Sequence, residues 1–195
     1  MAATDHSYAL FVAGNLVVRA AGRNDAPAIA AVSVASRQWS YRDVLAEADL
    51  AVLSVEATTA DFAEGLAELG PDSAVFVAEL TGRVVGYAYV LPSPDLDVPS
   101  ESSELGSIYV TEEVAGTGVA PTLMNAAIEH TRAVGHGLLT LWVRTENGRA
   151  RRFYEKYGFR PDGGERFRPH DSLPIEMHEI RYRRSLEPPT AKAGE

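Results

Sequence analysis

Cysteine is absent from the chain of 195 residues. A disulfide, a thiol nucleophile and a cysteine-based metal site are therefore all excluded, and no spacing of histidines and carboxylates supports another kind of metal site. Because disulfides belong to oxidising compartments, the lack of cysteine fits a reducing cytoplasm, which is the location we expect.

Long apolar runs are also missing. The longest run near the N-terminus, residues 8–14, follows Asp5 rather than a basic stretch and is too short to span a bilayer. We expect neither a targeting segment nor a membrane segment, and hence no membrane partner.

Positive charge is scarce, with 18 Lys and Arg against 27 Asp and Glu, a formal net charge of -9. No overall positive field would attract nucleic-acid phosphates, so we expect no nucleic-acid partner. The charge is uneven, because residues 144–184 hold 11 basic and 7 acidic residues, which leaves 7 basic and 20 acidic residues elsewhere. This basic region favours a small polyanionic ligand, and a solvated face without a partner is the alternative.

Apolar residues make up 46% of the chain, enough for one domain with a substantial core. The patterns predict strands at 15–21, 73–80, 83–91, 104–110, 138–143 and 175–183. They predict helices that begin at Asn24 or Asp25, after Thr58 or Thr59, near Val119 and at Asn147. The turn Thr81-Gly82 makes the second and third strands a hairpin, and the proline-rich stretch 92–103 is a candidate substrate loop.

The element order β-α-α-β-β-β-α-β-α-β predicts a single-domain α+β fold with a mixed sheet flanked by helices. The domain would span 15–184, after an N-terminal extension at 1–14 and before a disordered tail at 185–195. The first helix would present Ile29, Val32 and Ala35 on one face.

A loop with two glycines, Gly116 and Gly118, joins the strand at 104–110 to the helix that follows. A helix N-terminus has unpaired backbone N–H groups and partial positive charge, and glycines let a phosphate approach them. The loop is a candidate phosphate site; a tight turn that needs positive φ at either glycine is an equally good explanation.

Two other phosphate-binding loops do not fit. A dinucleotide-binding fingerprint needs a third glycine or alanine where Pro121 stands and an acidic residue about twenty positions later, where the chain has only the run from His136 to Thr140. A Walker A loop needs Gly-Lys before Ser or Thr, and no lysine is nearby.

A second motif places Asn147 at a strand end and Tyr154 two helical turns later. The two motifs read Ala115-Gly116-Thr117-Gly118-Val119-Ala120, and Asn147 with Phe153-Tyr154-Glu155-Lys156-Tyr157-Gly158-Phe159. Together they resemble the GNAT superfamily of N-acetyltransferases (GCN5-related), whose cofactor loop reads Gln/Arg-x-x-Gly-x-Gly/Ala and whose next motif reads Asn, then Phe-Tyr-Glu-x-x-Gly-Phe. The resemblance covers residues 15–183 in element order and implies a GNAT-like mixed sheet.

The resemblance implies acetyl-CoA as cofactor. Its contacts would come from Tyr109, Val110, Ala115, Gly116, Thr117, Gly118, Val119, Ala120, Asn147, Arg149 and Tyr154. Ala115 stands where the family usually has Gln or Arg, so one side-chain contact to the pyrophosphate is missing. Because backbone N–H groups remain, we expect weakened rather than abolished binding. Asn147 would bind the pantetheine arm, and a helix N-cap is its alternative or additional role.

The implied reaction is direct attack by a primary amine of a small molecule or peptide on the acetyl carbonyl, without an acyl-enzyme. Tyr154 matches the family's general acid, and a phenol keeps its proton at neutral pH; a packing role is the alternative. Glu104 resembles the family's base. Period-two alternation places it on one face with Gly106, Ile108 and Val110, where apolar surroundings would raise its pKa; an exposed strand-end charge is the alternative.

The remaining candidates are weaker. The backbone N–H of Val110 is the implied oxyanion donor. We expect His178 and Glu176 to lie on an ordinary strand surface, and His130 and His136 on the surface near the end of the long helix. A non-catalytic acyl-CoA-binding module is the rival to the enzyme. A homodimer is also open, because GNAT proteins are often dimers.

Overall fold

One mixed β-sheet organises the chain in the computed structural model, which describes residues 11–13 and 15–186. The strand order is β1-β2-β3-β4-β5-β6-β8-β7, and all neighbours are antiparallel except β5 and β6. The strands are β1 (Phe11–Ala13), β2 (Leu16–Ala20), β3 (Ala74–Leu80), β4 (Arg83–Pro92), β5 (Ser102–Val110), β6 (Leu138–Arg144), β7 (Arg160–Pro169) and β8 (Glu176–Ser185). This confirms the predicted α+β class.

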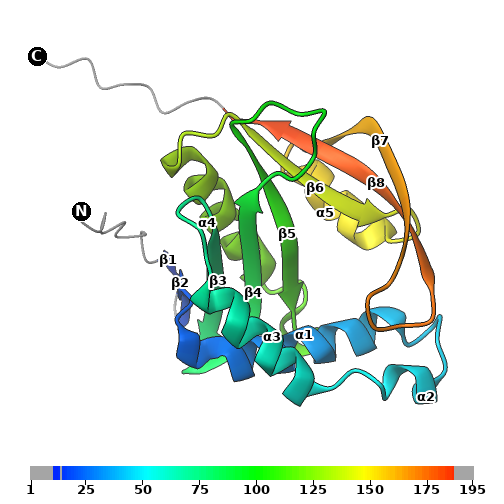
Figure 1. Cartoon of the computed structure of the whole chain (residues 1–195). Coiled ribbons are helices and arrows are strands. Elements are labelled where there is room, and N and C mark those ends of the chain that lie inside the picture. Colours follow the sequence, from blue (N-terminus) through cyan, green and yellow to red (C-terminus); the bar gives the residue numbers. More distant parts are fainter. Residues whose placement is uncertain (1–10, 14, 187–195) are drawn as a thin grey trace, which may run out of the picture.

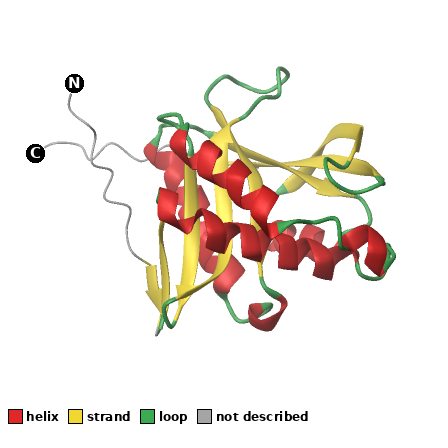
Figure 2. Ribbon diagram, turned by 60° about the horizontal axis from the view of Figure 1, so that its bottom comes forward, coloured by secondary structure: helices red, strands yellow, loops and turns green. Residues whose placement is uncertain are grey.

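Helices cover both faces of this sheet (Figure 1, Figure 2). They are α1 (Ala26–Tyr41), α2 (Glu47–Leu50), α3 (Val55–Ala67), α4 (Val119–Ala133) and α5 (Gly148–Lys156), with short 3-10 helices η1 (Arg23–Asp25) and η2 (Glu112–Val114). The main core lies under α4 and α5, with Leu123 and Tyr182 fully buried, and a second core under α1 and α3 contains Ile29 and Tyr87.

The parallel pair β5 and β6 separates soon after it begins. Only Ser102–Glu104 of β5 pairs with Leu138–Thr140 of β6, although both strands continue beyond these residues. Figure 1 shows β6, β8 and β7 turning away from β5. The sheet therefore opens at its centre, between the two motifs that the sequence singled out.

A β-bulge in β5 interrupts the period-two alternation that was predicted for that strand. Tyr89 pairs with Ser107 and the next residue, Val90, pairs with Leu105, so Gly106 is an extra residue. Leu105 and Ile108 consequently pack into the same core under α4, although they are three positions apart. Glu104 therefore does not share its face with Ile108 and Val110 as predicted.

The hairpin was predicted correctly. Thr81 and Gly82 both have positive φ, 52° and 79°, the conformation of a type I′ turn between twisted antiparallel strands. Helix α3 begins at Val55, earlier than predicted, because the Ser54 hydroxyl caps it by accepting a hydrogen bond from the Ala57 N–H (3.2 Å).

Three elements were missed. Strand β1 lies inside the predicted extension and pairs with β2, and α2 is a single turn. The sequence of β7 predicts a turn-rich segment instead of a strand, because it contains Pro161, Gly163 and Gly164. It is an edge strand with half-buried and exposed residues in alternation, which contains few of the apolar residues by which a strand is recognised.

The burial of four residues differs from the prediction. His130 and His136 are buried: His130 Nε2 lies 3.1 Å from the Asp72 carbonyl oxygen, and His136 Nδ1 lies 2.8 Å from Ser103 Oγ. Ala35, predicted on the buried face of α1, is exposed. Leu186 of the predicted tail is buried and its N–H donates to the Gly137 carbonyl; residues 187–195 lie outside the described part.

Within the described residues, every helix falls short of the length and apolarity that a membrane crossing needs.

Gly86 of β4 pairs with Val110, the last residue of β5, at the opening. A Cβ at this position would lie 2.9 Å from Val110 Cγ1 and 3.0 Å from the Tyr109 carbonyl oxygen. We predict that Gly86→Ala lowers the free energy of unfolding by about 1–3 kcal/mol, because a packed core does not accept an added methyl group without strain. Urea unfolding measures this.

The matched control is Gly65→Ala in α3, where a Cβ would meet no atom within 4 Å. That variant is expected to gain about 0.5–1 kcal/mol, because alanine replaces glycine inside a helix. Equal effects of the two substitutions would contradict the packing described for Gly86.

Candidate active site

The end of β5 presents backbone groups toward the opening. The Thr111 N–H donates to the Val85 carbonyl (2.9 Å), and the ladder pairs Gly86 with Val110. Because hydrogen-bonded and non-hydrogen-bonded pairs alternate in an antiparallel ladder, Val110 belongs to a non-hydrogen-bonded pair. Its N–H and C=O therefore point away from β4, toward the side that β6 has left.

Helix α1 crosses this opening and binds one of the two Val110 backbone groups, the carbonyl. The buried Ser36 hydroxyl donates to the Val110 carbonyl (2.8 Å), and Tyr41 Oη donates to Met177 Sδ of β8 (3.7 Å). The second half of α1 thus joins the two parts of the sheet (Figure 1). The Val110 N–H remains as a donor directed into the opening, the position predicted for an oxyanion donor.

The glycine loop lies at the same end of β5. Gly116 and Gly118 have φ of 80° and 100°, and a Cβ at either residue would meet no atom within 4 Å. Conformation rather than crowding therefore requires glycine here. Gly118 is the N-cap of α4 and has no side chain to bind the N–H groups of the first turn, which stay available to a ligand. The open loop fits a phosphate group.

The residues around the glycines are arranged in the same loop. Thr117 is exposed and its hydroxyl donates to the Val114 carbonyl (2.7 Å), which fixes the turn. Ala115 is half-buried in extended backbone and supplies no polar side chain. Val119 is buried and Ala120 packs against the main core, so these two residues can offer only backbone groups.

Asn147 is the N-cap of α5, the alternative that the sequence left open. Its Oδ1 accepts a hydrogen bond from the Ala150 N–H (3.0 Å), which leaves its amide NH₂ for another partner. Arg149, on the first turn of α5, is exposed and stacks on Trp39 of α1 with its Cζ 4.0 Å from the ring centroid. The start of α5 therefore contacts α1 near the opening.

Tyr154 is half-buried on α5 against the main core, with its ring 5.6 Å from Phe153 and 6.1 Å from Phe159. Burial raises the pKa of the Tyr154 phenol above its ordinary value, and the neighbouring Tyr109 raises it further. Tyr154 thus packs against the core, which is the packing role given as its alternative, and its phenol also keeps its proton at neutral pH.

Glu104 lies on β5 where β6 begins to diverge, and its Oε2 is buried without a hydrogen-bond partner in the described residues. Burial raises the pKa of the Glu104 carboxyl, and the negative charge of Asp95 raises it further. The predicted direction of the shift is confirmed. Its surroundings are more polar than the apolar surface that was predicted. The charge of Glu104 raises the pKa of the half-buried Tyr89, and charged residues of β7 and β8 act on the pKa of Glu104.

A network that the sequence did not indicate holds the loop between β4 and β5. Arg181 of β8 donates to Asp97 through two bonds of 2.6 Å, to Asp95 (3.1 Å) and to Asp162 (2.9 Å). Asp95 also accepts from Trp142 Nε1 (3.2 Å). The predicted substrate loop is thereby tied to β6 and β8, and no spacing in the sequence links these residues.

The other candidates lie outside the opening. Glu176 is exposed, and His178 pairs with Glu165 and stacks on Phe167 with centroids 4.3 Å apart, so the strand-surface interpretation is confirmed. No group of His, Asp and Glu among the described residues could hold a metal ion.

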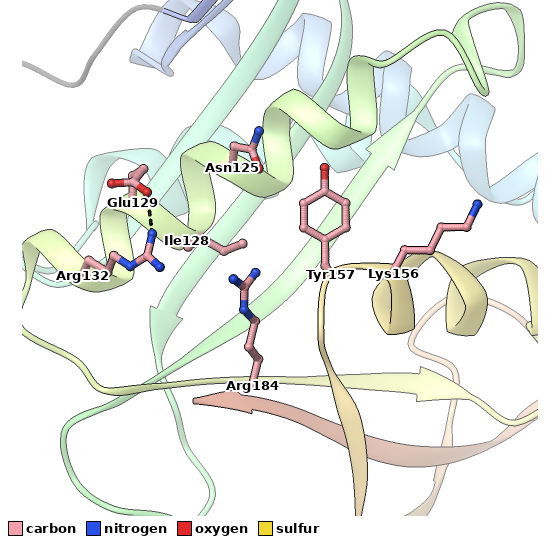
Figure 3. A pocket seen from close by; sticks show the side chains of 7 residues that line it. All are labelled: Asn125, Ile128, Glu129, Arg132, Lys156, Tyr157 and Arg184. Atoms are coloured by element: carbon pink, nitrogen blue, oxygen red, sulfur yellow. Dashed lines mark hydrogen bonds and ion pairs between the residues drawn. The ribbon is translucent and has the colours of Figure 1, made fainter. Parts of the chain in front are cut away.

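A separate cavity of about 380 Å³ lies between α4, α5 and the end of β8 (Figure 3). Its lining residues are Asn125, Ile128, Glu129, Arg132, Lys156, Tyr157 and Arg184. The Tyr157 hydroxyl donates to the Pro121 carbonyl (3.2 Å), a bridge from α5 to the first turn of α4. None of the predicted site residues lines this cavity, so we place the candidate site at the opening instead.

Comparison with known proteins gives the class to which this fold and site belong. Residues 28–159 match the model of the acetyltransferase (GNAT) family. An uncharacterised N-acetyltransferase of Mycobacterium tuberculosis is 34% identical over 147 residues, which cover 74% of this chain and 88% of that protein. The chain belongs to the acetyltransferase (GNAT) family. It is an N-acetyltransferase.

Solved structures share the fold. The PaiA N-acetyltransferase of Thermoplasma acidophilum in complex with coenzyme A has a TM-score of 0.66 and 17% identity, covering 88% of this chain and 99% of that one. A putative acetyltransferase of Salmonella typhimurium with acetyl-CoA has a TM-score of 0.64 and 17% identity, covering 91% and 98%. At this level of identity the likeness shows the fold.

The buried oxygen of Glu104 leads to a prediction about stability. A carboxyl whose pKa is raised by folding binds its proton more tightly in the folded state, so wild type loses stability as pH rises above the unfolded value, about 4.3. Glu104→Gln removes this charge. We predict that the variant is more stable than wild type at pH 7 by about 1 kcal/mol, and that the difference shrinks toward pH 4.

Urea unfolding between pH 4 and pH 8 measures this difference. Glu64→Gln, on the exposed surface of α3, is the control and should change stability little. A stabilisation by Glu104→Gln that is equal at all pH values would contradict the desolvated carboxylate.

Proposed function

We propose that the chain transfers the acetyl group of acetyl-CoA directly to a primary amine of a small molecule or peptide, with Tyr154 as general acid and Glu104 as base. One observation carries the proposal: the separation of β5 from β6 leaves an unpartnered carboxylate oxygen on β5 and a protonated phenol on α5, on the two sides of one opening. Acetyl-CoA supplies the activated thioester.

The residues that would hold the cofactor fit its chemistry. The N–H groups at the start of α4 and the positive-φ glycines suit the pyrophosphate, and the free amide NH₂ of Asn147 suits the carbonyls of the pantetheine arm. The unpaired Val110 N–H suits the oxyanion that forms during attack. Each contact uses a donor that has no other role in the part of the chain described.

The two proton transfers follow from the surroundings of Glu104 and Tyr154. A carboxylate with a raised pKa is a stronger base than an exposed one, so Glu104 takes the proton of the incoming ammonium, directly or through water. The Tyr154 phenol keeps its proton until a thiolate departs beside it. An isolated charge is costly in this apolar environment, which favours proton transfer to the leaving group.

Tyr154→Phe tests the acid. We predict that kcat falls by about 10²- to 10⁴-fold, because one proton transfer in the transition state is lost, while the affinity for acetyl-CoA stays within about threefold. Thiol release from acetyl-CoA with a panel of primary amines measures kcat, and calorimetric titration measures binding.

Tyr157→Phe is the matched control, since it removes a phenol one turn further along from Tyr154, whose hydroxyl bonds to Pro121. Its kcat should remain near that of wild type. An unchanged kcat in Tyr154→Phe would exclude the proposed acid. If wild type binds acetyl-CoA but acetylates none of the amines, a non-catalytic acyl-CoA-binding module replaces the enzyme.

Ala115 offers a test by gain of function. Ala115→Gln restores a donor of the kind that the family loop usually has, and we predict that coenzyme A binds about 2- to 10-fold more tightly, the effect of one added hydrogen bond. Titration calorimetry with coenzyme A measures this. Ala133→Gln, at the exposed far end of α4, should leave the affinity unchanged; unchanged affinity in Ala115→Gln too would place the pyrophosphate elsewhere.

A further inference from the structure

Basic side chains gather on the side of the opening that α1 crosses. Arg37 follows Ser36, whose hydroxyl binds the Val110 carbonyl. Arg144, the last residue of β6, lies over Tyr41 with its Cζ 4.5 Å from the ring centroid. The His170 ring lies 5.6 Å from the same tyrosine. Elements far apart in the sequence thus bring three nitrogen-bearing side chains to one place.

The electrostatics agree with this placement. Burial lowers the pKa of His170, and the positive charges of Arg37, Arg168 and Arg144 lower it further, against an opposing effect of Asp171. The His170 imidazole is therefore neutral at pH 7. Its Nδ1 accepts from the Ser172 N–H (3.1 Å) and the Leu173 N–H (3.2 Å), so its proton lies on Nε2, which can donate.

Neither Arg37 nor Arg144 forms an ion pair with a buried carboxylate in the described residues. The Glu179 carboxylate is taken by Arg166 (2.8 Å) and Arg168 (2.9 Å). The carboxylate of an ion pair nearest to Arg144 belongs to Glu146, 3.7 Å away and 63% exposed, and Arg37 forms no ion pair within the described residues. A guanidinium shielded from water gains from an anion that binds it through paired hydrogen bonds.

This cationic patch is adjacent to the proposed chemistry. Burial raises the pKa of Tyr109; the positive charge of Arg37 and its hydrogen bond to the Tyr109 side chain oppose this shift, and Tyr41 and Glu179 add to it. Tyr109 also raises the pKa of Tyr154, and Glu179 acts on Glu104 as well. Tyr109 thus interacts both with Arg37 and with the proposed acid.

We propose that Arg37 and Arg144, with His170, bind the carboxylate of the acceptor, and that the acceptor is an amino acid whose amine is directed toward Glu104. The site then has opposite charges at its two ends, a Glu104 carboxylate oxygen without a hydrogen-bond partner in the described residues and two guanidinium groups without a buried counter-ion there, which match the two charges of a zwitterion. This inference rests on the proposed function and adds the class of substrate.

The test uses matched acceptors: the twenty standard amino acids, the amines that lack the carboxylate, and the carboxamides that keep its shape without its charge. Thiol release from acetyl-CoA is measured for each. We expect at least one amino acid to be acetylated with a kcat/KM at least about 10-fold above that of its amine and its carboxamide, the discrimination of one charged hydrogen-bonded contact.

Variants then assign the preference to residues. Arg37→Gln and Arg144→Gln should each raise KM for that amino acid by about 10- to 100-fold with little change in kcat, and leave its amine unaffected. Arg37→Lys should restore part of the loss, because a lysine keeps the charge without the paired donors. Calorimetric titration of the amino acid onto the coenzyme A complex should show the same loss of affinity.

Arg23→Gln is the control, an exposed arginine in η1 at the opposite end of α1. Amines or carboxamides that react as well as the amino acids would overturn the proposal, and so would an Arg37→Gln defect of equal size for all three classes. Binding of acetyl-CoA with no turnover of any amino acid would overturn it while leaving the acetyl donor in place. Failure to bind acetyl-CoA would instead refute the proposed function.

Discussion

The site depends on the early separation of β5 from β6. Two parallel strands that pair at three positions and then diverge leave backbone groups of the sheet interior without their usual partners. Ser36 of α1 satisfies the Val110 carbonyl, and Arg181 of β8 donates a hydrogen bond to the loop between β4 and β5. The remaining N–H of Val110 is the donor that we propose for the acyl oxygen.

Ion pairs hold β8 to the elements around it. Arg181 ties β8 to Asp95 and Asp97 of the loop between β4 and β5, and Glu179 ties β8 to β7. The two Arg181 pairs join residues 86 and 84 positions apart. They also place a fixed negative charge, Asp95, close enough to Glu104 to influence its pKa.

Sequence patterns predicted the parts of the fold that local chemistry determines. The Thr81-Gly82 turn, the glycine loop and the cap at Asn147 depend on backbone conformation and nearby hydrogen bonds, and they lie where predicted. Strand β7 was missed because its glycines and proline mask an edge strand that is stabilised by pairing with β8. The extra residue at Gly106 was missed because a bulge is defined by the partner strand, which a single segment does not reveal.

The candidate site shows the same division between local and long-range contacts. Glu104 and Tyr154 were predicted from the resemblance, whereas the further residues that we propose, Arg37, Arg144 and His170, come from three elements with no shared spacing. His130 and His136 were misplaced because their hydrogen-bond partners, Asp72 and Ser103, make burial tolerable, and those partners are distant in the sequence. Contacts between residues distant in the sequence determine both the position of these three residues and the burial of the two histidines.

The geometry of the glycine loop affects how its importance can be detected. With Ala115 in place of a polar residue, the loop offers main-chain donors whose direction is set by the positive φ of Gly116 and Gly118. Removing the side chains of Thr117 or Val119 leaves those donors in the chain. A survey that truncates each side chain to alanine would therefore not remove the donors themselves, because they belong to the main chain.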